Sequence, residues 1–210
     1  MKLETSKYWP VNIIDEDIEK YKKVQIERHL SKRHIKREKN KYYYLFNKTR
    51  QFFHHEMKDA LCLGTRNNHE RDCFQEFFDM KQKGVKVLSL DLSSYSGADF
   101  IMDFNTLPEK WECKWDFIFS NSIDHSLSAT KTFFEWYRVL KTHGVMVLAF
   151  DLWKGKQHRP VATDCCLFTK RSVDRFFDNF ESINPFTIKD RFIQKWISAD
   201  EYYNIVITKN

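Results

Sequence analysis

Four short apolar segments, each ended by a glycine or a polar residue, constrain the fold of this chain more than any other feature. They are residues 60–63, 86–90, 115–119 and 145–150, followed in turn by Gly64, Asp91, Ser120 and Asp151. Runs of this length that are largely apolar are typical of buried parallel strands. The sequence therefore predicts four parallel strands between residues 59 and 151.

The segments between these strands have the spacing of helices. Residues 69–83 carry three Phe at helical spacing, and residues 129–140 carry Phe133, Phe134 and Tyr137. Alternating strands and helices predict a mostly parallel sheet with helices on both faces. A further helix is expected to end at 176–180. Residues 186–188 and 202–208 look like parts of two strands, and the short link between them favours an antiparallel pair.

The amino-terminal part of the chain differs in charge from the rest. Residues 1–58 hold 15 Lys and Arg against 8 Asp and Glu, a net charge of +7, whereas the other 152 residues hold 20 against 21. Residues 12–58 look helical, with Ile14, Ile18, Tyr21 and Val24 at helical spacing and Ser31 as a cap of a second helix. We therefore divide the chain into a basic helical extension or lid (1–57) and a domain (58–210).

Within that extension, six basic residues are concentrated between positions 32 and 41. Such a run is typical of a solvated helix face, and it is also suited to an arm that contacts an anionic substrate.

Cysteine usage and hydropathy indicate the compartment. The cysteines are Cys62, Cys73, Cys113, Cys165 and Cys166, an odd number without the spacing of a zinc or redox site. No secretory signal and no apolar run long enough to span a bilayer is visible. We expect free thiols, a cytoplasmic location and no metal site.

The residues after the predicted strands are the place to look for a ligand, because open α/β sheets bind ligands at the carboxyl ends of their strands. No Gly-Lys-Ser/Thr follows Gly64, which excludes a phosphate-binding P-loop. Asp91 is placed either to accept hydrogen bonds from a ribose diol or to lie in a surface turn. Asp103 beside Phe104 offers adenine an acceptor for its amino group and a flat apolar wall.

In this order and at this spacing, the motifs of residues 58–151 resemble the class I, Rossmann-like, S-adenosylmethionine-dependent methyltransferases. The motifs Leu-Gly-Thr-Arg-x-x-His-Glu (63–70), Asp-Phe-x-x-Leu-Pro (103–108) and Ser-Asn-Ser-x-Asp-His (120–125) look most like a methyltransferase-11-type subgroup. The resemblance implies an α/β, mostly parallel seven-stranded sheet with an antiparallel strand at the carboxyl end. It also implies that residues 58–210 bind S-adenosylmethionine and release S-adenosylhomocysteine.

The resemblance also implies which residues contact this cofactor. Its methionine part would lie against the loop after residues 60–63 (the first loop), its ribose against the loop after residues 86–90, its adenine against residues 103–104, and its sulfonium against the loop after residues 115–119. The corresponding residues are Gly64, Thr65 and Arg66; Asp91 and Leu92; Asp103 and Phe104; and Ser120, Asn121 and Ser122. The chain departs from the family in having one glycine in the first loop, Cys62 where an acid is common, and Lys-Thr-His-Gly at 141–144 instead of Lys-Pro-Gly-Gly.

Methyl transfer to a hydroxyl group needs a positioned nucleophile and a general base. His125 and Asp124 are the first candidates for this catalytic role, since they follow the predicted strand at 115–119, and Asp151 is a further carboxylate that could reach the substrate. Residues 153–160 are either a surface loop or a substrate loop. In the second case Lys154, Lys156, His158 and Arg159 would lie near an anionic group, and Trp153 would stack on a ring.

Some acceptors can be argued against. The Asp/Asn-Pro-Pro-Tyr/Trp sequence of adenine amino-methylation is absent, and no Cys follows a Pro as cytosine C5 chemistry requires. A small molecule, a saccharide or its nucleotide-linked precursor, a protein side chain or RNA remains, and the near-neutral domain favours a small molecule or glycan over RNA. Two alternatives stay open. The chain could be an RNA methyltransferase that uses the basic amino-terminal helices, or a non-catalytic cofactor-binding relic whose first loop holds a single glycine.

Overall fold

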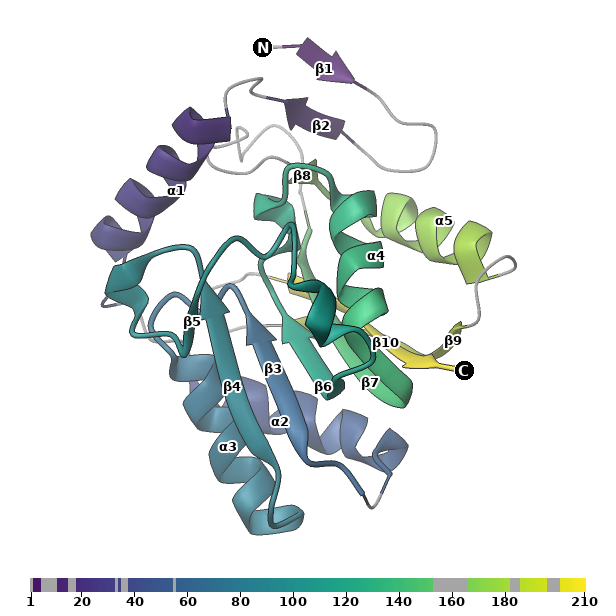
Figure 1. Ribbon diagram of the computed structural model, residues 1–210. Helices are drawn as coiled ribbons and strands as arrows, with labels where there is room; N and C mark the ends of the chain where they lie inside the picture. The colour runs from purple at the N-terminus through teal and green to yellow at the C-terminus, as the bar shows by residue number, and fades with distance from the viewer. Residues whose placement is uncertain are drawn as a thin grey trace.

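A seven-stranded sheet in the order β5-β4-β3-β6-β7-β10-β9 forms the centre of the molecule (Figure 1). This computed structural model describes residues 2–4, 11–14, 18–32, 34, 38–54, 56–152, 166–181, 186–195 and 201–210. The strands are β3 (Asp59–Leu63), β4 (Lys86–Asp91), β5 (Phe100–Ile101), β6 (Trp115–Ser120), β7 (Leu140–Asp151), β9 (Phe186–Lys195) and β10 (Glu201–Lys209).

Strand pairing follows the predicted pattern. β5, β4, β3, β6 and β7 pair in parallel, and β10 pairs antiparallel with both β7 and β9. The four predicted apolar strands and the antiparallel carboxyl-terminal pair are therefore confirmed. Parallel pairing brings the ends of β3, β4 and β6 to one edge, where Leu63 lies opposite both Leu90 and Ser120.

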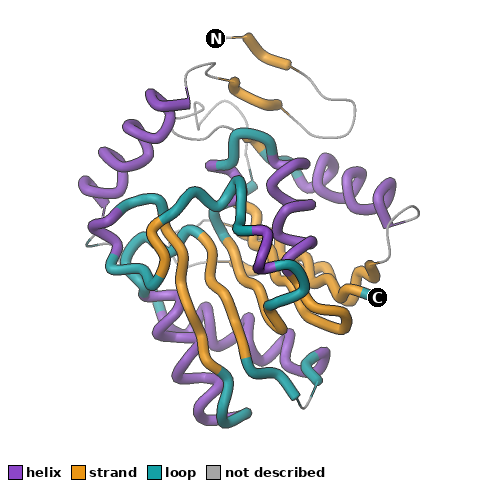
Figure 2. The backbone as a smooth tube through the Cα atoms, in the orientation of Figure 1, coloured by secondary structure: helices purple, strands orange, loops and turns teal. Residues whose placement is uncertain are grey.

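Helices cover both faces of the sheet, as predicted (Figure 2). α2 (Lys39–Thr49) and α3 (His69–Lys81) lie on one face, and α4 (Ala129–Val139) and α5 (Lys170–Glu181) on the other (Figure 1). Phe side chains from these helices fill both interfaces: Phe74 packs on Phe117 on one face, and Phe133 packs on Phe177 on the other. Each buried Phe contributes about 1.5–3 kcal/mol through burial alone, so the abundance of Phe is explained by two apolar interfaces.

The amino-terminal part is not helical throughout. β1 (Lys2–Glu4) and β2 (Val11–Ile14) form a small antiparallel sheet with β8 (Cys166–Leu167). The prediction that Ile14 belongs to a helix is therefore wrong, because Ile14 pairs with Lys2 in β2. Ser31 caps no second helix: it lies inside α1 (Ile18–Lys32), where its hydroxyl donates to the Arg28 carbonyl. In β2, strand pairing with β1 and β8 overrides the local helical periodicity.

The two amino-terminal helices contact different parts of the molecule. α2 buries Tyr42, Leu45 and Phe46 in the same apolar cluster as α3 and the sheet. α1 instead lies at the carboxyl edge of the sheet, near β4 (Figure 1). Of these two helices, only α1 is therefore placed as a cover over the strand ends.

The predicted turn at residues 141–144 lies inside β7 as a bulge. Trp115 pairs with Leu140, but Phe117 pairs with Val145, so residues 141–144 of β7 stand opposite a single residue of β6. His143 takes a positive φ of 63° within this bulge. The proposed substrate loop at 153–160 lies outside the described residues. No helix in the described parts of the chain is long and apolar enough to cross a membrane.

Candidate functional site

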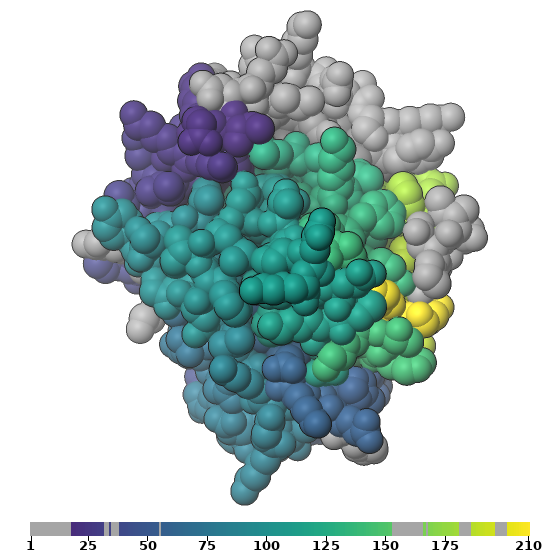
Figure 3. Space-filling view, viewed as in Figure 1, coloured from purple at the N-terminus to yellow at the C-terminus, as the bar shows by residue number. Residues whose placement is uncertain are grey.

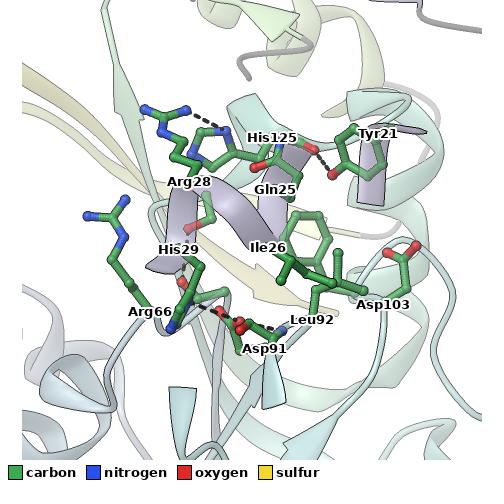
Figure 4. Close-up of a pocket in the computed structure, with 14 residues that line it drawn as sticks. Tyr21, Gln25, Ile26, Arg28, His29, Arg66, Asp91, Leu92, Asp103 and His125 are labelled. Atoms are coloured by element: carbon green, nitrogen blue, oxygen red, sulfur yellow. Dashed lines mark hydrogen bonds and ion pairs between the residues drawn. The ribbon is translucent and has the colours of Figure 1, made fainter. Parts of the chain in front are cut away.

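A cleft opens where β3, β4 and β6 end, and α1 lies over it. It encloses about 590 Å³ of empty space, part of which is open solvent. In the space-filling view, α1 (purple) lies against the teal surface of the domain (Figure 3). We call this space the main cleft; it is lined by Tyr21, Gln25, Ile26, Arg28, His29, Gly64, Arg66, Asp91, Leu92, Ser93, Asp103, Phe104, Ser122 and His125 (Figure 4).

Asp91 is the central acid of the main cleft. It ends β4, is 9% exposed, and its Oδ1 accepts a hydrogen bond from the Ser93 amide at 2.8 Å. His29 Nδ1 of α1 lies 3.6 Å from the same oxygen. Burial raises the pKa of Asp91 to about 6, an effect that the Ser93 amide and the Arg66 charge oppose. A buried carboxylate at the end of the second parallel strand is suited to accept hydrogen bonds from a diol.

Gly64 brings the first loop, which follows β3, close to the loop after β6. Its φ is +76°, and its amide donates to the Leu90 carbonyl at 2.8 Å. The Ser122 hydroxyl donates to the Gly64 carbonyl at 3.1 Å, and an added Cβ on Gly64 would lie 2.6 Å from the Ser122 Cβ. The left-handed backbone and this close approach both require glycine here. The single glycine of the first loop therefore occupies the position where a left-handed backbone and the close approach of Ser122 exclude any side chain.

Asp103 and Phe104 form the far wall of the main cleft. Asp103 lies at the rim (Figure 4), where its Oδ1 accepts from the amide and the side chain of Asn105. Phe104 is buried, packs edge-to-face on Trp136, and accepts the indole hydrogen bond of Trp136 at its carbonyl. Leu92 and Ile26 contribute apolar surface to the same cleft. The main cleft thus combines a flat apolar wall with a carboxylate at its edge.

Two of the predicted cofactor residues line neither this cleft nor the chamber beside it. Thr65 is buried, and its hydroxyl bonds to Asn68 within the first loop. Ser120 is buried, and its hydroxyl donates to the Leu63 carbonyl, which ties β6 to β3. Both side chains hold the loops in place. Cys62, where an acid is common, is fully buried, and burial raises the pKa of its thiol well above its usual value.

A second space, the side chamber, adjoins the main cleft and shares Arg28, Gly64, Arg66, Ser122 and His125 with it. It also encloses about 600 Å³ of partly open space. Its remaining lining residues come from α3 and the loop before it, the loop after β6, and the facing ends of β7 and β10: Asn67, His69, Glu70, Asn121, Asp124, Asp151 and Tyr202. The structure therefore brings the three predicted catalytic residues, Asp124, His125 and Asp151, together in one chamber.

The His125 ring lies between a cation and an anion. Arg28 Nη1 is 3.5 Å from His125 Nδ1, and Asp124 Oδ2 is 3.9 Å from His125 Nε2. A guanidinium only donates, so the contact with Arg28 is a hydrogen bond in the tautomer that leaves Nδ1 unprotonated and carries the ring proton on Nε2, facing Asp124. Tyr21 of α1 also donates to the His125 carbonyl. α1 and the loop after β6 thus contact each other at His125, through Tyr21 and Arg28.

Sequence reasoning missed most of the α1 residues in the site. Tyr21, Gln25, Arg28 and His29 recur at helical spacing and face the main cleft (Figure 4). Polar residues break the apolar pattern after Val24 because this face of the helix covers a polar cleft. Glu70 and Tyr202 were missed too, since their places in the chamber depend on tertiary packing. Among the described residues, no group of three His, Cys, Asp or Glu could hold a metal ion.

A scan against protein-family profiles finds no match, and a sequence search of curated proteins finds no relative. Solved structures do match. The 1,6-didemethyltoxoflavin-N1-methyltransferase of Burkholderia thailandensis, with bound 1,6-didemethyltoxoflavin and S-adenosylhomocysteine, is 14% identical with a TM-score of 0.67. This match covers 92% of this chain and 91% of that one.

Two further matches show what else the fold carries. The geranyl diphosphate C-methyltransferase of Streptomyces coelicolor A3(2), in complex with Mg²⁺, geranyl diphosphate and S-adenosylhomocysteine, is 12% identical with a TM-score of 0.52, over 73% of this chain and 71% of that one. The [4+2]-cyclase SpnF is 12% identical with a TM-score of 0.57, over 79% and 80%.

These likenesses show the fold. The chain has the α/β, Rossmann-like fold of the class I methyltransferases, as the motifs predicted. At 12–14% identity the fold does not by itself show the reaction, and the methyltransferase-11-type subgroup remains a prediction.

Proposed function

We propose that this protein is an S-adenosylmethionine-dependent methyltransferase that acts on a small-molecule or saccharide acceptor. The observation that carries the proposal is the main cleft itself, in which Asp91, Asp103 and Phe104 stand at the ends of neighbouring strands. The structural neighbours that hold S-adenosylhomocysteine support the cofactor.

The residues of the main cleft fit an adenosyl group. The Ser93 amide and His29 both approach Oδ1 of Asp91, which leaves Oδ2 as an acceptor for a ribose diol. Phe104, Leu92 and Ile26 supply apolar surface for the adenine, and Asp103 supplies an acceptor at the rim. Since Gly64 and Ser122 lie on the boundary between the main cleft and the side chamber, we assign the reacting methyl group to this boundary.

When bound, S-adenosylmethionine supplies an electrophilic methyl carbon on a sulfonium. The chain must hold the acceptor in line with that carbon, which is worth several kcal/mol in well-oriented reactions, up to about 7–11. It must also accept the proton of a hydroxyl acceptor. We assign this role to His125, with Asp124 holding the ring. His125 Nδ1 becomes available when the acceptor hydroxyl replaces Arg28 beside it.

α1 acts as a lid in this proposal. Five of its side chains line the main cleft, and His29 faces Asp91 at 3.6 Å. A lid that excludes water strengthens the electrostatic interactions inside the site. Part of the basic charge of the amino-terminal part belongs to α1, whose Arg28 lines the cleft.

We expect S-adenosylhomocysteine to bind at one site and to bind less tightly as the pH falls. The pKa of Asp91 is about 6, so its carboxylate is mostly ionised at about pH 7.5 and mostly protonated at about pH 5. A protonated carboxyl is a poorer acceptor for the ribose diol, and affinity should therefore drop as the pH falls through about 6. Titration calorimetry at several values between about pH 5 and 8 measures this. Absence of binding at every pH would reject the proposed function.

A further inference from the structure

We propose that the side chamber is the acceptor site and that its acceptor is a neutral, hydroxyl-rich molecule such as a saccharide or a cyclitol. This inference rests on the proposed function and narrows the acceptor to one chemical class. It is carried by the lining of the chamber, by one buried carboxylate oxygen and by the balance of charge.

The described residues that line the side chamber are polar throughout. Apart from Gly64, each of its twelve lining residues has a side chain that donates or accepts hydrogen bonds, and none is aliphatic, Phe or Trp. A planar aromatic or prenyl acceptor would remove these groups from water without replacing their hydrogen bonds. Each unmade hydrogen bond costs about 1–3 kcal/mol. A molecule that carries several hydroxyl groups satisfies them instead.

Glu70 shows that the chamber needs a ligand that donates hydrogen bonds. It lies in the first turn of α3, is 8% exposed, and its Oε1 accepts from the Tyr42 hydroxyl at 2.9 Å. Its Oε2 is buried and has no hydrogen-bond partner among the described residues. Buried polar atoms without partners are rare in folded proteins. A hydroxyl group of a bound acceptor supplies the missing donor.

The charge of the chamber argues against an anionic acceptor. Glu70, Asp124 and Asp151 line it as carboxylates, against the two guanidinium groups of Arg28 and Arg66. A phosphorylated acceptor or an RNA backbone needs an excess of positive charge, and the described lining residues carry no excess of guanidinium groups over carboxylates. The carboxylates come from three separate elements and can accept from hydroxyl groups on several sides of a ring.

Because the main cleft and the side chamber adjoin, an acceptor in the chamber can react with the methyl group of a cofactor in the cleft. An acceptor hydroxyl oxygen attacks the methyl carbon, a C–O bond forms, and the C–S bond breaks with its electron pair moving to sulfur. The hydroxyl proton passes to the imidazole of His125, which lines both spaces. Arg66 and Ser122 also line both spaces, so the chamber opens directly onto the proposed position of the methyl group.

The test uses the full chain saturated with S-adenosylhomocysteine and two compound sets: neutral monosaccharides, oligosaccharides and inositols, and phenols, indoles and prenyl alcohols. Binding is measured by saturation-transfer NMR, and methyl transfer is measured with labelled S-adenosylmethionine. We expect members of the first set to bind and to be methylated. If none of the first set binds, or if only the second set is methylated, the proposal is overturned.

Substitutions of chamber residues test whether the acceptor binds in the side chamber. Glu70→Gln keeps an acceptor for the Tyr42 hydroxyl, so the fold should be retained, and Glu76→Gln, at an exposed position of the same helix, is the matched control. We expect Glu70→Gln and Asp151→Asn each to raise the acceptor KM about 10-fold and to leave the Kd of S-adenosylhomocysteine within about 2-fold.

A third ligand, methylthioadenosine, distinguishes a Glu70 that binds the acceptor from a Glu70 that binds the methionine part of the cofactor. Methylthioadenosine lacks the amino-acid end of S-adenosylhomocysteine. If Glu70→Gln weakens S-adenosylhomocysteine but neither methylthioadenosine nor the acceptor, the carboxylate holds the cofactor tail and the proposal is overturned. If S-adenosylhomocysteine does not bind the wild-type chain at all, the proposed function itself fails.

Discussion

Replacing Asp91 with Asn should weaken S-adenosylhomocysteine binding about 10- to 100-fold and at the same time make the unliganded protein more stable at neutral pH. The loss of affinity follows because a charge-assisted hydrogen bond to a hydroxyl contributes about 1.5–3 kcal/mol. The gain in stability follows because burial raises the pKa of Asp91 from 3.8 to about 6. The folded state at neutral pH therefore carries an ionised group that it disfavours.

The pH dependence of this gain has a definite sign. A pKa that is higher in the folded state than in the unfolded chain stabilises the protein below pH 3.8, and this contribution is lost as the pH rises through about 6. The amide of the Asp91→Asn variant cannot ionise, so the variant should gain about 1–3 kcal/mol at about pH 8 and about a third of that at about pH 4.5, because the aspartate of the unfolded wild-type chain is already mostly ionised there. Urea unfolding at both values measures it. A variant that is less stable at the higher pH would show that Asp91 has a structural role.

Replacing Gly64 with Ala should destabilise the fold by about 2–5 kcal/mol. Two causes add. Ala at a φ of +76° is strained, and its Cβ would lie 2.6 Å from the Ser122 Cβ and 2.7 Å from the Ser122 Oγ. Either the first loop or the loop after β6 must move, and both border the main cleft. Chemical denaturation gives the change in the free energy of unfolding.

Gly84 is the matched control for this prediction. Its φ is +91°, but nothing lies within 4 Å of an added Cβ. Gly84→Ala should therefore show only the backbone strain of about 1–2 kcal/mol. Removing the Ser122 side chain by Ser122→Gly should recover part of the loss in the Gly64→Ala background. Equal losses for Gly64→Ala and Gly84→Ala would contradict the close contact between the two loops.

The sequence predicted the sheet well because its strands are buried on both faces. Residues 60–63, 86–90, 115–119 and 145–150 are apolar for that reason, and each lies within an observed strand. The pairing of β2 with β8 was not predictable, because it joins Val11 and Leu167, which lie far apart in the chain. The bulge in β7 is also set by register with a neighbouring strand, and a local turn signal at 141–144 does not reveal it.

Some residues of the candidate site could be predicted from the sequence, and others could not. Gly64, Asp91 and Ser122 were found because each follows a predicted apolar run, and the sheet topology places all strand ends of that kind together. Phe104 was found because it stands beside an acid, Asp103. Thr65 and Ser120 also stand at strand ends, but their side chains turn inward and brace the loops. The α1 residues come from a helix whose position over the cleft depends on packing that no spacing in the sequence encodes.

The location of the charged residues changes how the net charge of the chain is interpreted. The net charge of +6 by itself suggests nucleic acid. The side chamber instead holds three carboxylates and two guanidinium groups, and the excess of basic residues lies in the amino-terminal part, where α1 covers the main cleft.

A crystal structure with S-adenosylhomocysteine bound tests the central claim most directly. We predict that the ribose hydroxyls lie within hydrogen-bond distance of the Asp91 carboxylate, with the adenine between Asp103 and the Phe104–Leu92 surface and α1 closed over it. The sulfur should lie beside Ser122, facing the side chamber. A ligand bound elsewhere, or a ribose that does not touch Asp91, would contradict the assignment of the main cleft as the cofactor site.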